Sequence, residues 1–149
     1  MDPERIDVEA AWRELQERQG TVYLDVRTEE EFATGHPEGA INVPIGIANP
    51  ALQRLEANPD FLAVTRAAAP EGTPLLVGCA TGPRAQMAAR LLTENGYTDV
   101  RWVLGGMHGI TDPMGRVVAP GWTALGLPES REAGDGAAYR SLRRKAGLD

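Results

Sequence analysis

An apolar run that ends at the chain's single cysteine, followed closely by a helix-forming segment, constrains the fold most. Residues 75–78 are Leu-Leu-Val-Gly, Cys79 follows, and a short turn leads to Pro83 and a segment rich in Ala, Leu and Arg. The apolar run is typical of a buried strand, and proline suits the first turn of a helix because its missing N–H costs little there. The sequence therefore predicts that Cys79 lies at the carboxyl end of a buried strand, just before a helix.

This position favours a reactive thiolate. Unpaired backbone N–H groups in the turn and the N-terminus of a helix both stabilise negative charge. Arg84 adds a guanidinium that can hold an anion with two parallel hydrogen bonds. We predict that Cys79 is a nucleophile and that Arg84, with loop residues Ala80, Thr81 and Gly82, binds an anionic substrate. The alternative is an unreactive cysteine, because lone cysteines are often small buried hydrophobes.

The rest of the chain alternates between strand and helix patterns. Strands are predicted at residues 21–26, 40–43, 75–78 and 99–104. Helices are predicted at residues 8–19 with Asp7 as cap, after a capping box at 28–31, once or twice within 50–69 with a break at 58–59, and at 83–95. This alternation favours an α/β fold with a mostly parallel sheet and helices on both faces. Ligands in such folds bind beyond the carboxyl ends of the strands, where Cys79 is expected.

Five motifs, in order along the chain, resemble those of the single-domain rhodaneses, sulfurtransferases that carry sulfane sulfur as a cysteine persulfide. They are Asp25-Val26-Arg27 with Glu31-Phe32, Gly35-His36 with residues 39–44, Cys79-x-x-Gly82-x-Arg84, residues 99–106 ending in Gly105-Gly106, and Gly121-Trp122 through Pro128. Residues 58–62 and 77–79 are most similar to small plant-type thiosulfate sulfurtransferases. The resemblance covers about residues 5–128 and implies a three-layer rhodanese-like fold. We expect one domain over residues 1–149, with a C-terminal extension at 129–149.

The resemblance also implies a reaction. Cys79 would take sulfur from thiosulfate or a related small anionic donor and pass it to cyanide, a thiol or a protein acceptor, without a metal or organic cofactor. Asp25 is expected to support the site by bracing nearby loops. Arg27 is also expected to support the site, and we predict that it forms an ion pair with Glu30 or Glu31.

Three features depart from the family's pattern. Pro83 removes one N–H donor from the loop, Ala85 replaces the hydroxyl residue often found after the arginine, and residues 111–120 resemble an insertion. They leave the preference for thiosulfate open. The insertion is either a passive surface loop or a rim that brings Arg116 toward an anionic donor, and residues 116–118 are expected to form a brief extended piece.

Other conspicuous side chains favour structural roles. His36 is expected to be a structural histidine rather than a general base. Packing is expected for Trp12, Trp102 and Trp122. A solvated helix face, with docking to an acidic partner as the alternative, is expected for Arg140, Arg143, Arg144 and Lys145.

Two other functions remain open. Phosphatases and arsenate reductases also place a cysteine and an arginine in an anion-binding loop, usually with five residues between them. Only four residues separate Cys79 from Arg84, a spacing that should be too tight for a tetrahedral phosphate. The second alternative is a non-catalytic interaction module with the same fold, against which the intact Cys79 argues.

Charge and composition narrow the expected partners. The net charge of −6 disfavours nucleic acid and anionic membranes. No apolar run approaches membrane-spanning length, and the first residues lack the basic and apolar pattern of a secretory signal. One cysteine and two histidines provide neither a disulfide framework nor a convincing zinc site. We therefore expect a cytoplasmic enzyme.

Overall fold

The protein is built around a five-stranded parallel sheet. The computed structural model describes residues 2–132 and 136–148, and the strand order is β1-β8-β7-β2-β4. All four pairs of adjacent strands are parallel. The strands are β1 (Glu4–Asp7), β2 (Val22–Asp25), β4 (Ile41–Asn42), β7 (Leu75–Gly78) and β8 (Val100–Leu104). The predicted α/β fold is confirmed.

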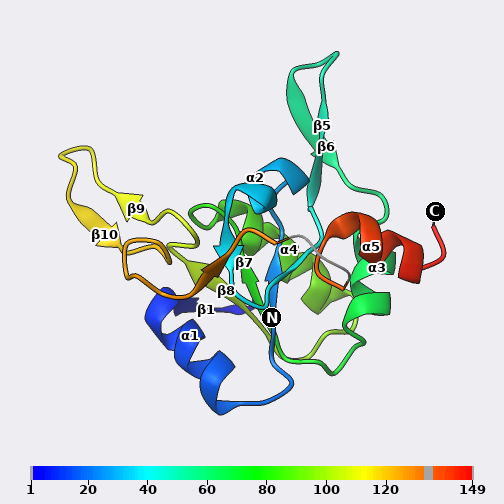
Figure 1. Ribbon diagram of the computed structural model, residues 1–149, viewed down its shortest axis with the longest axis horizontal. Helices are drawn as coiled ribbons and strands as arrows, with labels where there is room; N and C mark the ends of the chain where they lie inside the picture. Colours follow the sequence, from blue (N-terminus) through cyan, green and yellow to red (C-terminus); the bar gives the residue numbers. More distant parts are fainter. Residues whose placement is uncertain (1, 133–135, 149) are drawn as a thin grey trace.

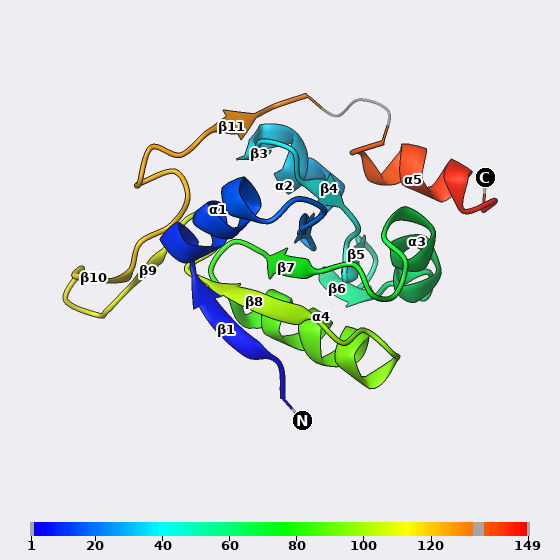
Figure 2. The same cartoon turned by 90° about the horizontal axis from the view of Figure 1, so that it is seen from below.

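Helices cover both faces of this sheet. They are α1 (Val8–Glu17), α2 (Glu29–Thr34), α3 (Phe61–Ala68), α4 (Pro83–Glu94) and α5 (Tyr139–Lys145). Figure 2 shows α1 on one side of the central strands and α4 on the other. Successive side chains of a strand point to opposite faces, so Leu75 and Val77 of β7 join the core that includes α3, α4 and α5. Leu76 joins the core that includes α1 and Phe32 of α2.

The helix ends follow the signals in the sequence. Asp7 caps α1, since its Oδ1 accepts a hydrogen bond of 2.7 Å from the N–H of Ala10. The predicted capping box of α2 is present, with Thr28 and Glu31 each accepting a hydrogen bond from the other's backbone N–H. Helix α4 begins at Pro83, directly after the loop that contains Cys79. The helix that follows Cys79 therefore has the predicted position.

Residues 46–57 form a hairpin where a helix was predicted from residue 50 onward. Strand β5 (Gly46–Asn49) pairs antiparallel with β6 (Arg54–Ala57). The Asn49 side chain accepts hydrogen bonds from the N–H groups of Ala51 and Leu52, an arrangement that competes with helix formation. Gln53 adopts a φ of 51°, which a helix does not allow. The predicted helix at 50–57 is therefore wrong, whereas the one after residue 59 is present as α3.

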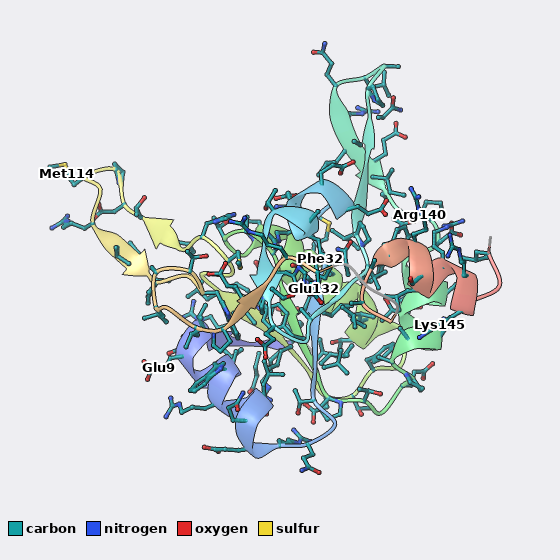
Figure 3. The ribbon with its side chains drawn as sticks, viewed as in Figure 1. Glu9, Phe32, Met114, Glu132, Arg140 and Lys145 are labelled. Carbon is teal, nitrogen blue, oxygen red and sulfur yellow. The ribbon has the colours of Figure 1, made fainter. Side chains whose placement is uncertain are left out.

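Two further short pairs of strands lie outside the main sheet. Strand β3 (His36–Pro37) pairs with β11 (Glu129–Ser130), and β9 (Ile110–Thr111) pairs with β10 (Val117–Ala119). Of the extended piece predicted at residues 116–118, Val117 and Val118 lie in β10, whereas Arg116 precedes the strand. Hairpins β5–β6 and β9–β10 both project from the body of the molecule (Figure 1), and Met114, 80% exposed, lies at the far end of the latter (Figure 3).

The three tryptophans have packing positions, as predicted. Trp122 is 1% exposed, and its indole N–H donates a hydrogen bond of 2.8 Å to the carbonyl of Pro128. Trp102 is buried and Trp12 is half-buried against the core that includes α1.

The basic cluster of α5 is mostly solvated. Arg140, Arg144 and Lys145 are exposed, as predicted. Arg143 differs, because it is half-buried and forms an ion pair with Asp60 whose Nη1–Oδ2 distance is 2.8 Å. In the described ranges, no helix combines the length and the apolarity needed to cross a membrane.

Candidate active site at Cys79

Cys79 begins a loop that is held from one side. The residue follows β7 directly and is 2% exposed. The carbonyl oxygens of Cys79, Ala80 and Thr81 accept hydrogen bonds of 2.7–2.9 Å from N–H groups in the segment 105–108, which follows β8. The three carbonyl groups therefore point toward that segment.

The N–H groups of the same loop point in the opposite direction to its carbonyl groups. Because the peptide bonds are trans, each N–H points away from the carbonyl before it. The N–H groups of Ala80, Thr81 and Gly82 therefore point away from the segment 105–108, and none of them donates a hydrogen bond within the described part of the chain. Such a set of backbone donors suits an anion. These N–H groups belong to the three loop residues that the sequence predicts as anion-binding.

Gly106 allows the loop and its supporting segment to approach closely. Its φ is +52°, and a Cβ atom at this position would lie 2.2 Å from the carbonyl oxygen of Cys79 and 2.9 Å from that of Ala80. Any larger residue would push the loop away. The pair Gly105-Gly106 was predicted to end the strand at 99–104, and two adjacent glycines are also a signal for close backbone approach.

The guanidinium of Arg84 is engaged by a carboxylate of the protein. Its Nη1 and Nη2 donate to Oε1 and Oε2 of Glu31 at 2.7 and 3.0 Å, a two-bond ion pair between α4 and α2. Glu31 also accepts hydrogen bonds from the N–H and hydroxyl groups of Thr28. The anion that Arg84 was predicted to meet is thus supplied, in this structure, by Glu31. This partner was not predicted from the sequence.

The pair changes the titration of both groups. Hydrogen bonds from Arg84, assisted by the N–H of Thr28, lower the pKa of Glu31 from 4.5 to about 2 against the opposing effect of burial. The hydrogen bond with Glu31 in turn raises the pKa of Arg84, and the nearby charges of Cys79 and Asp25 act in the same direction.

Arg27 pairs with Asp25, so the predicted pairing with Glu30 or Glu31 is wrong. Its Nε donates to Oδ1 at 3.0 Å and its Nη2 to Oδ2 at 2.8 Å. Both side chains are almost fully buried, and a buried charge needs an equally buried partner. Glu30 is exposed, and Glu31 is occupied by Arg84.

The Asp25–Arg27 pair connects several loops beside the site. Arg27 Nη2 also donates to the carbonyl of Gly35 at 2.8 Å. The side chain of Asn42 donates to the carbonyls of Asp25 and Arg27. Asp25 lies in register with Gly78, the residue before Cys79. This is the bracing arrangement expected of Asp25, and Arg27 takes part in it.

His36 has the surroundings of a structural histidine. It is 2% exposed, its Nδ1 lies 2.8 Å from the carbonyl oxygen of Phe32, and its ring is stacked on that of Phe32. In residues 2–132 and 136–148, no group of three or more His, Cys, Asp and Glu side chains could hold a metal ion.

Known proteins match this chain over most of its length. The rhodanese-like domain family matches residues 8–112. Thiosulfate sulfurtransferase 16, chloroplastic, from Arabidopsis thaliana is 41% identical over 87 residues, which are 58% of this chain and 71% of the relative. Rhodanese-like domain-containing protein 17 from the same plant is 38% identical over 103 residues, 68% of this chain and 64% of the relative.

A bacterial relative and two solved structures agree with the match to the rhodanese-like domain family. Thiosulfate sulfurtransferase GlpE from Haemophilus influenzae is 29% identical over 109 residues, 73% of this chain and 89% of the relative. The crystal structure of Rv0390 from M. tuberculosis has a TM-score of 0.70 at 30% identity and covers 89% of this chain and 100% of its own. The solution structure of a rhodanese-like domain from Anabaena, 22% identical with a TM-score of 0.60 over 87% of this chain and 80% of its own, shares the fold. The chain belongs to the rhodanese-like domain family.

Proposed function

We propose that this protein is a sulfurtransferase that carries sulfane sulfur as a persulfide on Cys79. The observation that carries the proposal is the loop geometry: Cys79 begins a loop whose carbonyls are bound on one side and whose next three N–H groups have no partner among residues 2–132 and 136–148. A persulfide anion on Cys79 would be stabilised by such donors. The relatives named thiosulfate sulfurtransferase support the same class of reaction.

The reaction consists of two displacements. The Cys79 thiolate attacks the outer sulfur of thiosulfate, the S–S bond of thiosulfate breaks, and its electron pair leaves with sulfite. A thiophile such as cyanide then attacks the outer sulfur of the Cys79 persulfide, so that thiocyanate forms and the thiolate is regenerated. The covalent intermediate divides one transfer into two easier steps.

The test is the formation of thiocyanate from thiosulfate and cyanide. Double-reciprocal plots at several cyanide concentrations should be parallel, because the first product leaves before the second substrate binds. Cys79→Ser should reduce the rate to that of the uncatalysed reaction. A Cys79→Ser protein that still turns over would overturn the proposal, as would intersecting plots for the wild type.

The same preparations should be offered a phosphomonoester. We expect no hydrolysis, because only four residues separate Cys79 from Arg84. Phosphate release that is lost in Cys79→Ser would assign the loop to phosphatase chemistry instead.

A further inference from the structure

The positive charge near Cys79 is largely neutralised within the protein. Arg84 gives two N–H groups to Glu31, and the buried Arg27 is matched by Asp25. A substrate at the loop therefore meets backbone N–H groups of residues 80–82 and of the first turn of α4, and a guanidinium already bound to a carboxylate. Pro83, the first residue of α4, provides no N–H donor there. These surroundings match one negative charge better than two.

An apolar groove begins beside the same arginine. From α4 it is lined by Arg84, Met87, Leu91 and Glu94, whose spacing places them on one face of the helix, and by Arg90, which forms an ion pair with Asp2. At 1.5 Å per residue, this face extends about 15 Å from the end of the Cys79 loop. The opposite wall consists of Ile45 and the hairpin β5–β6, which Figure 1 shows projecting beyond the sheet.

The groove has the size and chemistry of a site for an organic group. Its volume is about 460 Å³, within the range of pockets that bind small molecules. The lining includes the exposed side chains of Leu55 and Met87, 45% and 65% accessible. Large apolar side chains left open beside a reactive loop favour a ligand that covers them.

We propose that the groove binds the organic group of the sulfur donor, and that the site prefers singly charged organic sulfane compounds, such as thiosulfonates, to the thiosulfate dianion. This inference rests on the proposed function. With a thiosulfonate, the Cys79 thiolate attacks the outer sulfur, the S–S bond breaks, and the sulfinate leaves with the electron pair. The free N–H groups meet the single charge, and the groove receives the apolar group.

The first test compares three donors in the cyanide assay: benzenethiosulfonate, methanethiosulfonate and thiosulfate. Each kcat/KM is divided by the donor's rate with free cysteine, which removes differences in intrinsic reactivity. The normalised values should fall in that order, because the second donor lacks the large apolar group and the third carries an additional charge. Equal normalised values would overturn the inference.

Two leucines of the hairpin β5–β6 provide a matched pair of variants that tests binding in the groove. Leu55 lines it, whereas Leu52, 51% exposed, does not. Leu55→Ser should raise the KM for benzenethiosulfonate several-fold without changing that for methanethiosulfonate or thiosulfate, and Leu52→Ser should change none of the three. An equal effect of Leu55→Ser on all donors, or no effect, would contradict the proposed groove site.

Two glutamates of α2 provide a matched pair of variants that tests whether neutralisation of Arg84 disfavours the thiosulfate dianion. Glu31→Gln removes the carboxylate that neutralises Arg84, and Glu30→Gln removes an exposed one. Glu31→Gln should lower the KM for thiosulfate more than that for methanethiosulfonate, and Glu30→Gln should lower neither. An unchanged KM for thiosulfate in Glu31→Gln would contradict this assignment of Glu31. If that variant does not fold, the normalised kcat/KM values of the wild type for methanethiosulfonate and thiosulfate test the charge preference, and equal values contradict it.

The outcomes separate the inference from the proposed function. Intact mass is measured after each donor is added to the wild type. A protein that gains sulfur from all donors at equal normalised rates contradicts only the inference. A protein that gains sulfur from none of them contradicts the proposed function itself.

Discussion

Asp25 and Arg27 form an ion pair with two parallel hydrogen bonds inside the protein, where their side chains are only 2% and 1% exposed. The pair lies at the carboxyl end of β2, beside the strand that leads to Cys79. The Arg27 side chain connects the pair to the carbonyl of Gly35, and the Asn42 side chain of β4 binds the backbone carbonyls of the same two residues. The edge of the sheet on which the site is built therefore depends on a buried charge pair.

Removal of the Asp25 charge should destabilise the fold strongly. In Asp25→Asn the guanidinium of Arg27 stays buried without a counter-charge, which typically costs about 3–5 kcal/mol. Urea unfolding measures the loss. The control is Glu9→Gln, which removes a surface pair with an N–O distance of 4.0 Å to Arg13 and should cost less than about 1 kcal/mol. Similar losses in the two variants would show that burial does not decide the effect.

A side chain at residue 106 should disturb the Cys79 loop. Gly106 and Gly115 both have positive φ, but only at Gly106 would a Cβ meet other atoms within 4 Å. Gly115→Ala should cost about 1–2 kcal/mol, the ordinary penalty of a left-handed alanine, and should leave kcat unchanged. Gly106→Ala should cost more and should lower kcat. Wild-type kcat in Gly106→Ala would show that the support of the loop by residues 105–108 does not matter for turnover.

The Glu31–Arg84 pair should make the stability of the protein depend on pH in the acidic range. The pKa of Glu31 is about 2 in the folded protein against an ordinary 4.5. A carboxyl group whose pKa is lowered by folding stabilises the protein above its unfolded pKa, and this contribution disappears as the pH falls toward the folded pKa. The stability advantage of the wild type over Glu31→Gln should therefore be constant above pH 4.5 and shrink toward pH 2. Urea midpoints at a series of pH values test this, and a difference that does not change with pH would contradict it.

Loss of the Arg84 guanidinium should weaken the binding of anionic donors, because the negative charge of Glu31 is then unopposed. Arg84→Ala should raise the KM for thiosulfate, and Arg84→Lys should recover only part of the loss because an ammonium group lacks the two-pronged geometry. In the Arg84→Ala background, where the Glu31 carboxylate is unopposed, Glu31→Gln should lower the KM for thiosulfate by a larger factor than it does in the wild type. Additive effects of the two substitutions in the cyanide assay would show that the residues act independently.

The elements around Cys79 could be predicted because their signals are local. Strand β7 is a short apolar run, Pro83 marks the start of α4, and Asp7 marks the start of α1. The hairpin β5–β6 was missed because its turn depends on one side chain, Asn49, that competes with the helical pattern of its neighbours.

The partners of the arginines could not be predicted from the sequence. Arg84 and Glu31 are 53 residues apart and meet only because the fold brings the first turns of α2 and α4 to the same end of the sheet. Glu31 was recognised as the third helical residue of a capping box, and that local pattern does not indicate that Glu31 also pairs with Arg84. For Arg27 the nearby glutamates looked equally available, and burial, which selects Asp25, is a property of the fold.

The most direct test of the account is the intact mass of the protein after incubation with thiosulfate. The wild type should gain the mass of one sulfur atom, cyanide should remove it, and the Cys79→Ser variant should show no gain under the same conditions. A wild-type protein whose mass does not change, or a Cys79→Ser protein that gains the same sulfur, would contradict the claim that this chain transfers sulfur through Cys79.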